Sequence, residues 1–215
     1  MISDWDLYLV TDGNVHPGRT HIEETAAAIA GGVKVVQFRE KQMADRELIS
    51  IGAEIRSLTA EAGVDFVVNN RVDIALALGA DGVHVGQDDM PVALVRRLIG
   101  PRMILGASAS SVEEAVKAEK DGASYVAASP VFSTSTKLDA PKPTLLEGLR
   151  AISDAVDVPV VAIGGIGLNN VVDVVKAGAD SIAVVSAVVC APDMKEAATS
   201  LNSIIRDAKR ERVKN

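Results

Sequence analysis

Residues 79–85, Gly-Ala-Asp-Gly-Val-His-Val, place a glycine turn directly before a short valine-rich run. A glycine in the left-handed conformation ends a helix, and the valines after it are typical of a buried strand. The same arrangement recurs at residues 30–36, 62–68, 121–123 and 177–179. These repeated helix-to-strand turns predict a chain in which helices and strands alternate.

The rest of the chain completes this alternation. Apolar runs predict strands near residues 6–12, 34–40, 65–70, 82–86, 103–107, 125–129, 159–164 and 181–186. Helical periodicity predicts helices over residues 20–30, 45–62, 71–78, 91–99, 111–120, 144–155, 168–177 and 193–209. Because a closed barrel needs eight such strands, we predict an α/β fold, a single (β/α)8 TIM barrel, with residues 1–215 as one domain. An open doubly wound sheet is the alternative, but no Gly-x-Gly-x-x-Gly sequence opens its first unit.

Composition narrows the classes of function. Hydrophobic residues make up 48% of the chain and aromatic residues 3%, which predicts a core of Val, Ile, Leu and Ala. The formal net charge is −7, so a nucleic-acid surface, which needs a basic stripe, is not expected. Cys190 is the one cysteine, which excludes a disulfide framework and fits a reducing cytoplasm. With neither a basic leader nor an apolar run of membrane-spanning length, the sequence predicts a soluble cytoplasmic protein.

Polar residues directly after the predicted strands are the candidates for an active site, because that end of a barrel carries it. Arg39 and Lys41 follow the second strand on one alternating face, where both cations could bind a single phosphate group. The alternative is a solvent-exposed strand end with Glu40 in an ion pair.

A divalent cation is a second hypothesis for the same end of the barrel. An amide from residues 69–70 and a carboxylate from residues 88–89 follow the third and fourth strands, and such oxygen ligands suit Mg²⁺. Helix capping by Asp88 or Asp89 before Pro91 is the alternative, and it is favoured when these residues are considered by themselves. His84 lies within an apolar strand, and we expect it to be a core residue with satisfied hydrogen bonds.

Two further segments have a composition that suits an anion. Residues 164–167, Gly-Gly-Ile-Gly, follow the seventh strand just before a helix, where backbone N–H groups and the helix N-terminus favour a phosphate. Tight turns that merely need glycine are the alternative. The longest segment without periodicity, residues 129–143, contains the hydroxyls and the cation of Thr134–Lys137, and a disordered polar loop is its alternative. Ser108 either contacts substrate or caps the next helix.

Four stretches together closely resemble the thiamine-phosphate synthase (thiamine-phosphate pyrophosphorylase) family. They are Leu-Tyr-Leu-Val-Thr-Asp at 7–12, Gln-Phe-Arg-Glu-Lys at 37–41, Val-His-Val-Gly-Gln-Asp-Asp-Met-Pro at 83–91 and Ile-Gly-Gly-Ile at 163–166. They occur in the family's order and spacing and cover essentially the whole chain. The resemblance implies a transferase of thiamine biosynthesis that joins hydroxymethylpyrimidine diphosphate to thiazole phosphate. Thiamine phosphate forms and diphosphate leaves, with help from Mg²⁺ and without a protein nucleophile.

The resemblance also assigns residues to these two phosphorylated substrates. The pyrimidine diphosphate is expected at Gln37, Phe38, Arg39, Glu40, Lys41, Asn69, Ser108 and Lys137, with Arg39, Lys41, Ser108 and Lys137 as the catalytic groups. The thiazole phosphate is expected at Thr134, Ser135, Thr136, Gly165, Val185 and Ser186. The family places Mg²⁺ at Asn70 and Asp89. Many relatives carry aspartate where this chain has Asn70, and an amide removes one negative charge, so weaker Mg²⁺ binding is expected.

Two alternatives stand beside this function. A thiazole tautomerase of the same barrel superfamily would transfer a proton and would need no diphosphate site, and the presence of Arg39, Lys41, Asp89 and Lys137 argues against it. A non-catalytic phosphate-binding barrel would bind its ligand without turnover. The sequence predicts neither a nucleic-acid nor a membrane partner, and it leaves a homo-oligomer open.

Overall fold

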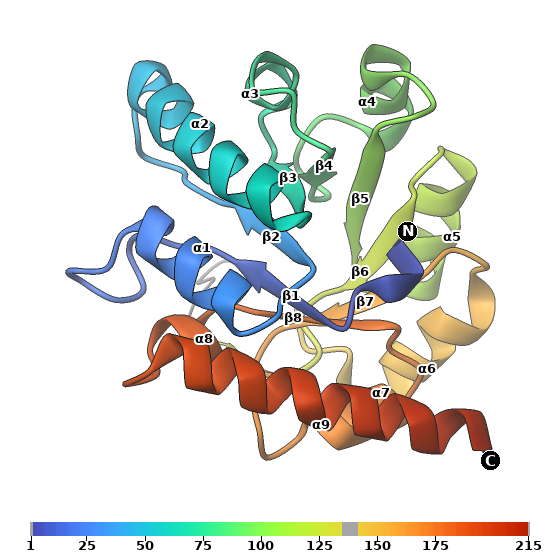
Figure 1. The fold of residues 1–215 in the computed structure, drawn as a ribbon. Helices are drawn as coiled ribbons and strands as arrows, with labels where there is room; N and C mark the ends of the chain where they lie inside the picture. Colours follow the sequence, from blue (N-terminus) through green and yellow to red (C-terminus); the bar gives the residue numbers. More distant parts are fainter. Residues whose placement is uncertain (1, 135–141, 215) are drawn as a thin grey trace.

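The computed structural model, which describes residues 2–134 and 142–214, is a closed barrel of eight parallel strands in the order of the sequence (Figure 1). The strands are β1 (Leu7–Val10), β2 (Val35–Phe38), β3 (Asp65–Asn69), β4 (Gly82–Val85), β5 (Ile104–Ala109), β6 (Tyr125–Ala128), β7 (Val160–Ile163) and β8 (Ser181–Val184). β1 closes the barrel against β8, with Tyr8 beside Ala183. The predicted (β/α)8 barrel is therefore confirmed.

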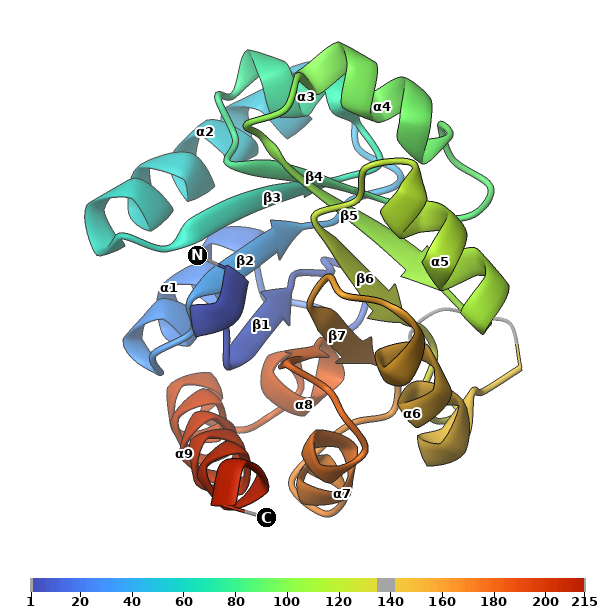
Figure 2. The same cartoon turned by 90° about the vertical axis from the view of Figure 1, so that its right-hand side faces the viewer.

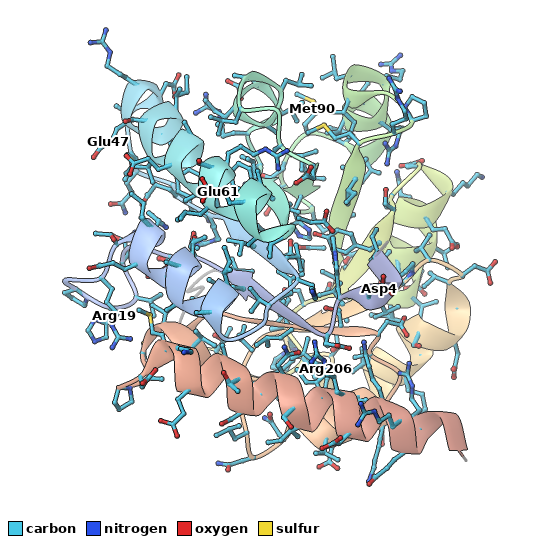
Figure 3. The ribbon with its side chains drawn as sticks, in the orientation of Figure 1. Asp4, Arg19, Glu47, Glu61, Met90 and Arg206 are labelled. Atoms are coloured by element: carbon cyan, nitrogen blue, oxygen red, sulfur yellow. The ribbon has the colours of Figure 1, made fainter. Side chains whose placement is uncertain are left out.

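Helices surround the strands on the outside (Figures 1 and 2). They are α1 (His21–Ala30), α2 (Asp45–Ala62), α3 (Val72–Ala77), α4 (Val92–Ile99), α5 (Val112–Lys120), α6 (Leu145–Ala155), α7 (Val171–Lys176), α8 (Ser186–Val189) and α9 (Met194–Lys214). The sequence did not predict α8 or the short 3-10 helix η1 (Ile2–Asp4). α9 packs between α1 and α7, and its Arg206, labelled in Figure 3, pairs with Asp6 at 2.9 Å just before β1.

The glycine turns that predicted the fold have the expected conformation. Each of the five helix-to-strand turns contains a glycine with positive φ, between 59° and 113°, which L side chains rarely adopt: Gly32, Gly63, Gly79, Gly122 and Gly178. The role of such a glycine in ending a helix is clearest in α2. There the N–H of the left-handed cap Gly63 donates to carbonyl groups of the last helical turn.

The core consists of two layers that differ in chemistry. Between the strands and the helices the side chains are mainly aliphatic, as composition predicts. Inside the barrel, however, the rings of Trp5, Tyr8 and Tyr125 pack edge to face, with centroids 5.4 to 6.2 Å apart. The tryptophan and both tyrosines of the chain thus lie at its centre, where large rings fill the barrel, whereas Phe38 and Phe66 belong to the outer layer.

No helix among the described residues is both long enough and apolar enough to cross a membrane. The carboxyl ends of all eight strands open on one face of the barrel, which places the residues after each strand around a single mouth.

Candidate active site

A cavity of about 720 Å³ opens at the carboxyl ends of the strands. Side chains or backbone from all eight strands line it, together with the turns after each strand except β1 and β5. The predicted site residues among its lining are Gln37, Arg39, Lys41, Asn69, Asn70, Asp89, Ser108, Thr134, Gly165, Val185 and Ser186. Ser135, Thr136 and Lys137 lie outside the described residues.

Among the predicted residues that the structure describes, two do not line the cavity. Phe38 is buried in the outer core, where its ring packs edge to face on His21 at 4.9 Å. Glu40 turns towards the same His21, with 3.3 Å between Glu40 Oε2 and His21 Nε2. Its other oxygen accepts the N–H groups of Lys41 and Gln42 at 2.6 and 2.7 Å. Glu40 therefore shapes the turn after β2 and contacts His21.

Arg39 and Lys41 both reach the cavity from the end of β2. The guanidinium of Arg39 forms an ion pair with Asp12, which follows β1 and is only 4% exposed. Asp12 ends the Leu-Tyr-Leu-Val-Thr-Asp stretch at residues 7–12, but it was not predicted as a site residue. Its position directly after the first strand was the available signal, because strand ends meet at the mouth.

Behind Asp12 lies a fully buried carboxyl group, that of Glu24 on α1. Burial raises the pKa of Glu24 to about 7, although a hydrogen bond from the Asp12 N–H, at 3.1 Å, opposes the rise. The nearby negative charge of Asp12 raises the pKa further. A second acid, Glu24, therefore lies behind the ion pair of Arg39 and Asp12, and burial favours its uncharged form.

Asn70 and Asp89 come together across β3 and β4. The Asn70 amide donates to Asp89 Oδ1 at 2.7 Å, and the Gly86 N–H donates to Asp89 Oδ2 at 2.7 Å. The capping alternative is wrong for Asp89, because the N-cap of α4 is Pro91 and no side chain caps that helix. We call the set of Arg39, Lys41, Asn70 and Asp89 the charged lobe of the cavity.

The charged lobe offers a cation few protein ligands. Within residues 2–134 and 142–214 no group of three or more His, Cys, Asp or Glu side chains is arranged to hold a metal. Asp89 and the amide oxygen of Asn70 could supply two oxygen ligands. This donor set fits Mg²⁺, which commonly takes one or two carboxylates and completes its shell with water and substrate phosphates.

The opposite side of the cavity is built mainly from backbone. Residues 164–167, together with Val185 and Ser186, form what we call the glycine lobe. Gly165 has φ +64°, and a Cβ there would lie 2.6 Å from the Ser133 carbonyl oxygen, because residues 130–133 lie against this turn. The turn thus needs glycine for packing. This supports the alternative of a tight turn as well as the hypothesis of a phosphate site. Ser186 begins α8, whose first N–H groups have no partner within that helix.

Ser108 lies on the cavity floor and does not cap a helix. The N-cap of α5 is Ser111, which accepts the Glu114 N–H. Ser108 Oγ instead lies 2.9 Å from His84 Nε2, and His84 Nδ1 lies 2.9 Å from the Tyr125 hydroxyl. His84 is thus hydrogen-bonded, as the sequence predicts, but it also lines the cavity. The floor residues Tyr8, His84 and Tyr125 were missed as site residues, although their alternation along β1, β4 and β6 points them inward.

Comparison with known proteins agrees with this geometry. Residues 7–188 match the family model described as thiamine monophosphate synthase. The chain belongs to the thiamine monophosphate synthase family. A thiamine-phosphate synthase from Chloroflexus aurantiacus is 55% identical over 204 residues, which cover 95% of this chain and 94% of the relative. One from Moorella thermoacetica is 47% identical, with 95% and 98% covered.

A solved structure supports the same assignment. The thiamine phosphate pyrophosphorylase from Pyrococcus furiosus superposes with a TM-score of 0.88 at 42% identity and covers 96% of this chain and 98% of its own. A 3-hexulose-6-phosphate synthase, at 20% identity and a TM-score of 0.66, shares the fold alone. Membership of the thiamine monophosphate synthase family makes the chain an enzyme of thiamine biosynthesis, a transferase that forms thiamine phosphate.

Proposed function

We propose that the chain joins hydroxymethylpyrimidine diphosphate to thiazole phosphate, with one substrate bound by each lobe of the cavity. The observation that supports this division is that one cavity has two differently built sides that each suit an anion: cationic side chains after β2, and a glycine turn with the start of α8 after β7 and β8. Two phosphorylated substrates need two such sites, and a single cavity brings their reacting atoms together.

The charged lobe takes the pyrimidine diphosphate. Arg39 and Lys41 bind the diphosphate and stabilise the charge that gathers on it as it leaves, and the family resemblance assigns Lys137, in the sequence after β6, to the same role. The ring lies over the floor, against Gln37, Asn69 and Ser108. Phe38 and Glu40 act indirectly, because their contacts with His21 hold the backbone of the turn that carries Arg39 and Lys41.

The glycine lobe takes the thiazole phosphate. Backbone N–H groups near Gly165, Val185 and Ser186 can donate to its oxygens, and a short extra helix after the eighth strand is a common phosphate site in barrels. Thr134 lines the same cavity from the loop after β6 and adds a hydroxyl, and Ser135 and Thr136 are assigned beside it by the family resemblance.

The reaction then breaks the bond between the pyrimidine methylene carbon and a diphosphate oxygen, and the oxygen keeps the electron pair. The thiazole nitrogen donates its lone pair to that carbon and forms the new bond. Asp89 and Asn70 would hold Mg²⁺, which would supply positive charge to stabilise the diphosphate. No protein nucleophile is required, so the residues of the chain bind, orient and neutralise charge.

The test is a diphosphate-release assay with the purified chain. We expect diphosphate only when both substrates and Mg²⁺ are present, and thiamine phosphate in equal amount. Asp89→Asn should reduce the rate at limiting Mg²⁺, whereas Asp154→Asn, the same change on an exposed side chain of α6 outside the cavity, should not. Equal release of diphosphate without thiazole phosphate, or without Mg²⁺, would contradict the proposal.

A further inference from the structure

Six polar side chains from six different strands form a continuous chain of hydrogen bonds across the cavity floor. It begins at Asn69, whose Nδ2 lies 2.9 Å from Gln37 Oε1, and continues through Gln37 Nε2 to the Tyr8 hydroxyl at 2.6 Å. The Tyr8 and Tyr125 hydroxyls lie 2.9 Å apart, and the chain ends in the contacts from Tyr125 through His84 to Ser108.

The orientation of the Gln37 amide, with Nε2 towards Tyr8 and Oε1 towards Asn69, selects one order of donors and acceptors along this chain. An amide N–H can only donate, so the Tyr8 oxygen accepts from Gln37 and its own single proton goes to Tyr125. The Tyr125 proton then goes to Nδ1 of His84. Nδ1 is therefore an acceptor, and the imidazole proton lies on Nε2 and is donated to Ser108 Oγ. The hydroxyl proton of Ser108 is left to donate into the cavity.

The middle of the chain is deeply buried and closely packed. Tyr8 and Tyr125 are 1% and 0% exposed, and burial raises the pKa of both phenols well above the usual range, so both keep their protons. The His84 ring stacks on Tyr125 with centroids 5.6 Å apart. A Cβ at Gly106 would lie 2.2 Å from Tyr125 Cζ and 2.5 Å from His84 Nδ1, so the glycine makes room for this contact.

We propose that Tyr125 and His84 are positioning residues that hold Ser108 as a hydrogen-bond donor and thereby set the specificity of the floor for an aminopyrimidine. Gln37 Oε1 accepts from Asn69 and has a second lone pair that can still accept near this end of the chain, and Ser108 is a donor at the other end. An aminopyrimidine presents the complementary groups, an amine that donates and ring nitrogens that accept. A ring with a carbonyl oxygen in place of the amine presents an acceptor to Gln37 and an N–H beside it, and its pairing fails. The inference rests on the proposed placement of the pyrimidine ring.

The first test concerns the protons themselves and needs no substrate. Nitrogen NMR of the isotopically labelled full chain distinguishes the imidazole tautomers of its three histidines, and His84→Gln identifies the signals of His84. We expect the His84 proton on Nε2 in the unsubstituted protein at neutral pH. A proton on Nδ1, or on both nitrogens, reverses or breaks the chain and overturns the proposal.

The second test concerns specificity. Tyr125→Phe keeps the ring but removes the link between Tyr8 and His84, and we expect the KM for the pyrimidine diphosphate to rise about tenfold, the value of one lost hydrogen bond, with kcat and the thiazole phosphate KM little changed. Preference for the amine over a carbonyl analogue should fall by a similar factor, and the Nε2 proton signal of His84 should weaken. Ser181→Ala, which removes a buried strand hydroxyl outside the chain, is the matched control.

The outcomes separate this inference from the proposed function. If Tyr125→Phe folds and keeps its preference for the amine, the positioning role is wrong while the reaction stands. If the unsubstituted chain forms no thiamine phosphate, the proposed function fails, and the NMR result still decides the order of protons on the floor.

Discussion

The two lobes of the cavity would hold an anion by different means. The charged lobe depends on side chains, and its Arg39 is oriented by Asp12 with the buried Glu24 behind it. The glycine lobe depends on the course of the backbone, with positive φ at Gly164 and Gly165 and the start of α8 beside them. An anion site built from charged side chains requires partner charges and the desolvation of those charges. An anion site built from backbone N–H groups requires mainly that the chain leave space for the anion. Different substitutions should therefore break each lobe.

The largest effect is expected from removing charge in the charged lobe. Arg39→Met should lower kcat/KM by roughly 10²–10³, because a donor aimed at the developing charge contributes that much. Steady-state kinetics with both substrates would measure it. Arg97→Met, which removes an exposed cation on α4, is the control. A loss smaller than about tenfold, which corresponds to 1.4 kcal/mol, would show that Arg39 does not meet the leaving group.

One added methyl group should disrupt phosphate binding by the glycine lobe. Gly165→Ala adds a Cβ 2.6 Å from the Ser133 carbonyl oxygen and forces a left-handed residue, so the turn must shift. We expect the KM for thiazole phosphate to rise about thirtyfold, in the range of a strained backbone residue, with little change for the pyrimidine diphosphate. Gly63→Ala is the control, because it forces the same left-handed residue at the end of α2, outside the cavity, with nothing within 4 Å of its added Cβ. Equal rises for both substrates would argue against separate lobes.

An effect of intermediate size is expected from adding a negative charge to the charged lobe. Asn70→Asp restores a carboxylate beside Asp89, which should lower the Mg²⁺ concentration for half-maximal activity about tenfold. Without Mg²⁺ the two carboxylates repel each other, so the variant should also melt earlier in the metal-free protein. Asn169→Asp adds the same charge on the glycine-lobe side of the cavity and should change neither quantity. An unchanged Mg²⁺ requirement in Asn70→Asp would remove Asn70 from the metal site.

The smallest effect on activity is expected at the buried acid behind the charged lobe, where the change is in stability. The pKa of Glu24 rises from its ordinary 4.5 to about 7 on folding, so the folded state binds this proton more tightly and loses stability as the pH rises through that window. Glu24→Gln cannot ionise and should gain about 2 kcal/mol in unfolding free energy relative to the parent between about pH 5 and pH 8. Urea unfolding at both pH values measures it, with exposed Glu47→Gln (Figure 3) as the control. A pH-independent difference would show that Glu24 does not titrate in this range.

Much of the cavity could be predicted from residues next to one another in the sequence. Arg39 and Lys41 follow a predicted strand, and Gly165 follows another, so local reasoning and the family motifs place them at the mouth of the barrel. Phe38 shows where this reasoning ends, because a range of consecutive residues includes both faces of a strand. Only the alternation of side chains separates Phe38 in the outer core from Gln37 on the floor.

The sequence by itself determined the alternation of strands and helices, the closed barrel and the end at which polar residues gather, because these depend on periodicity and on glycine turns within short segments. Tertiary structure alone decided which distant side chains meet. Asp12 pairs with Arg39, Asn70 with Asp89, and the floor chain joins residues 8, 84 and 125. The physical reason is that these contacts depend on strand order and register, which bring inward-facing side chains of separate strands to hydrogen-bonding distance.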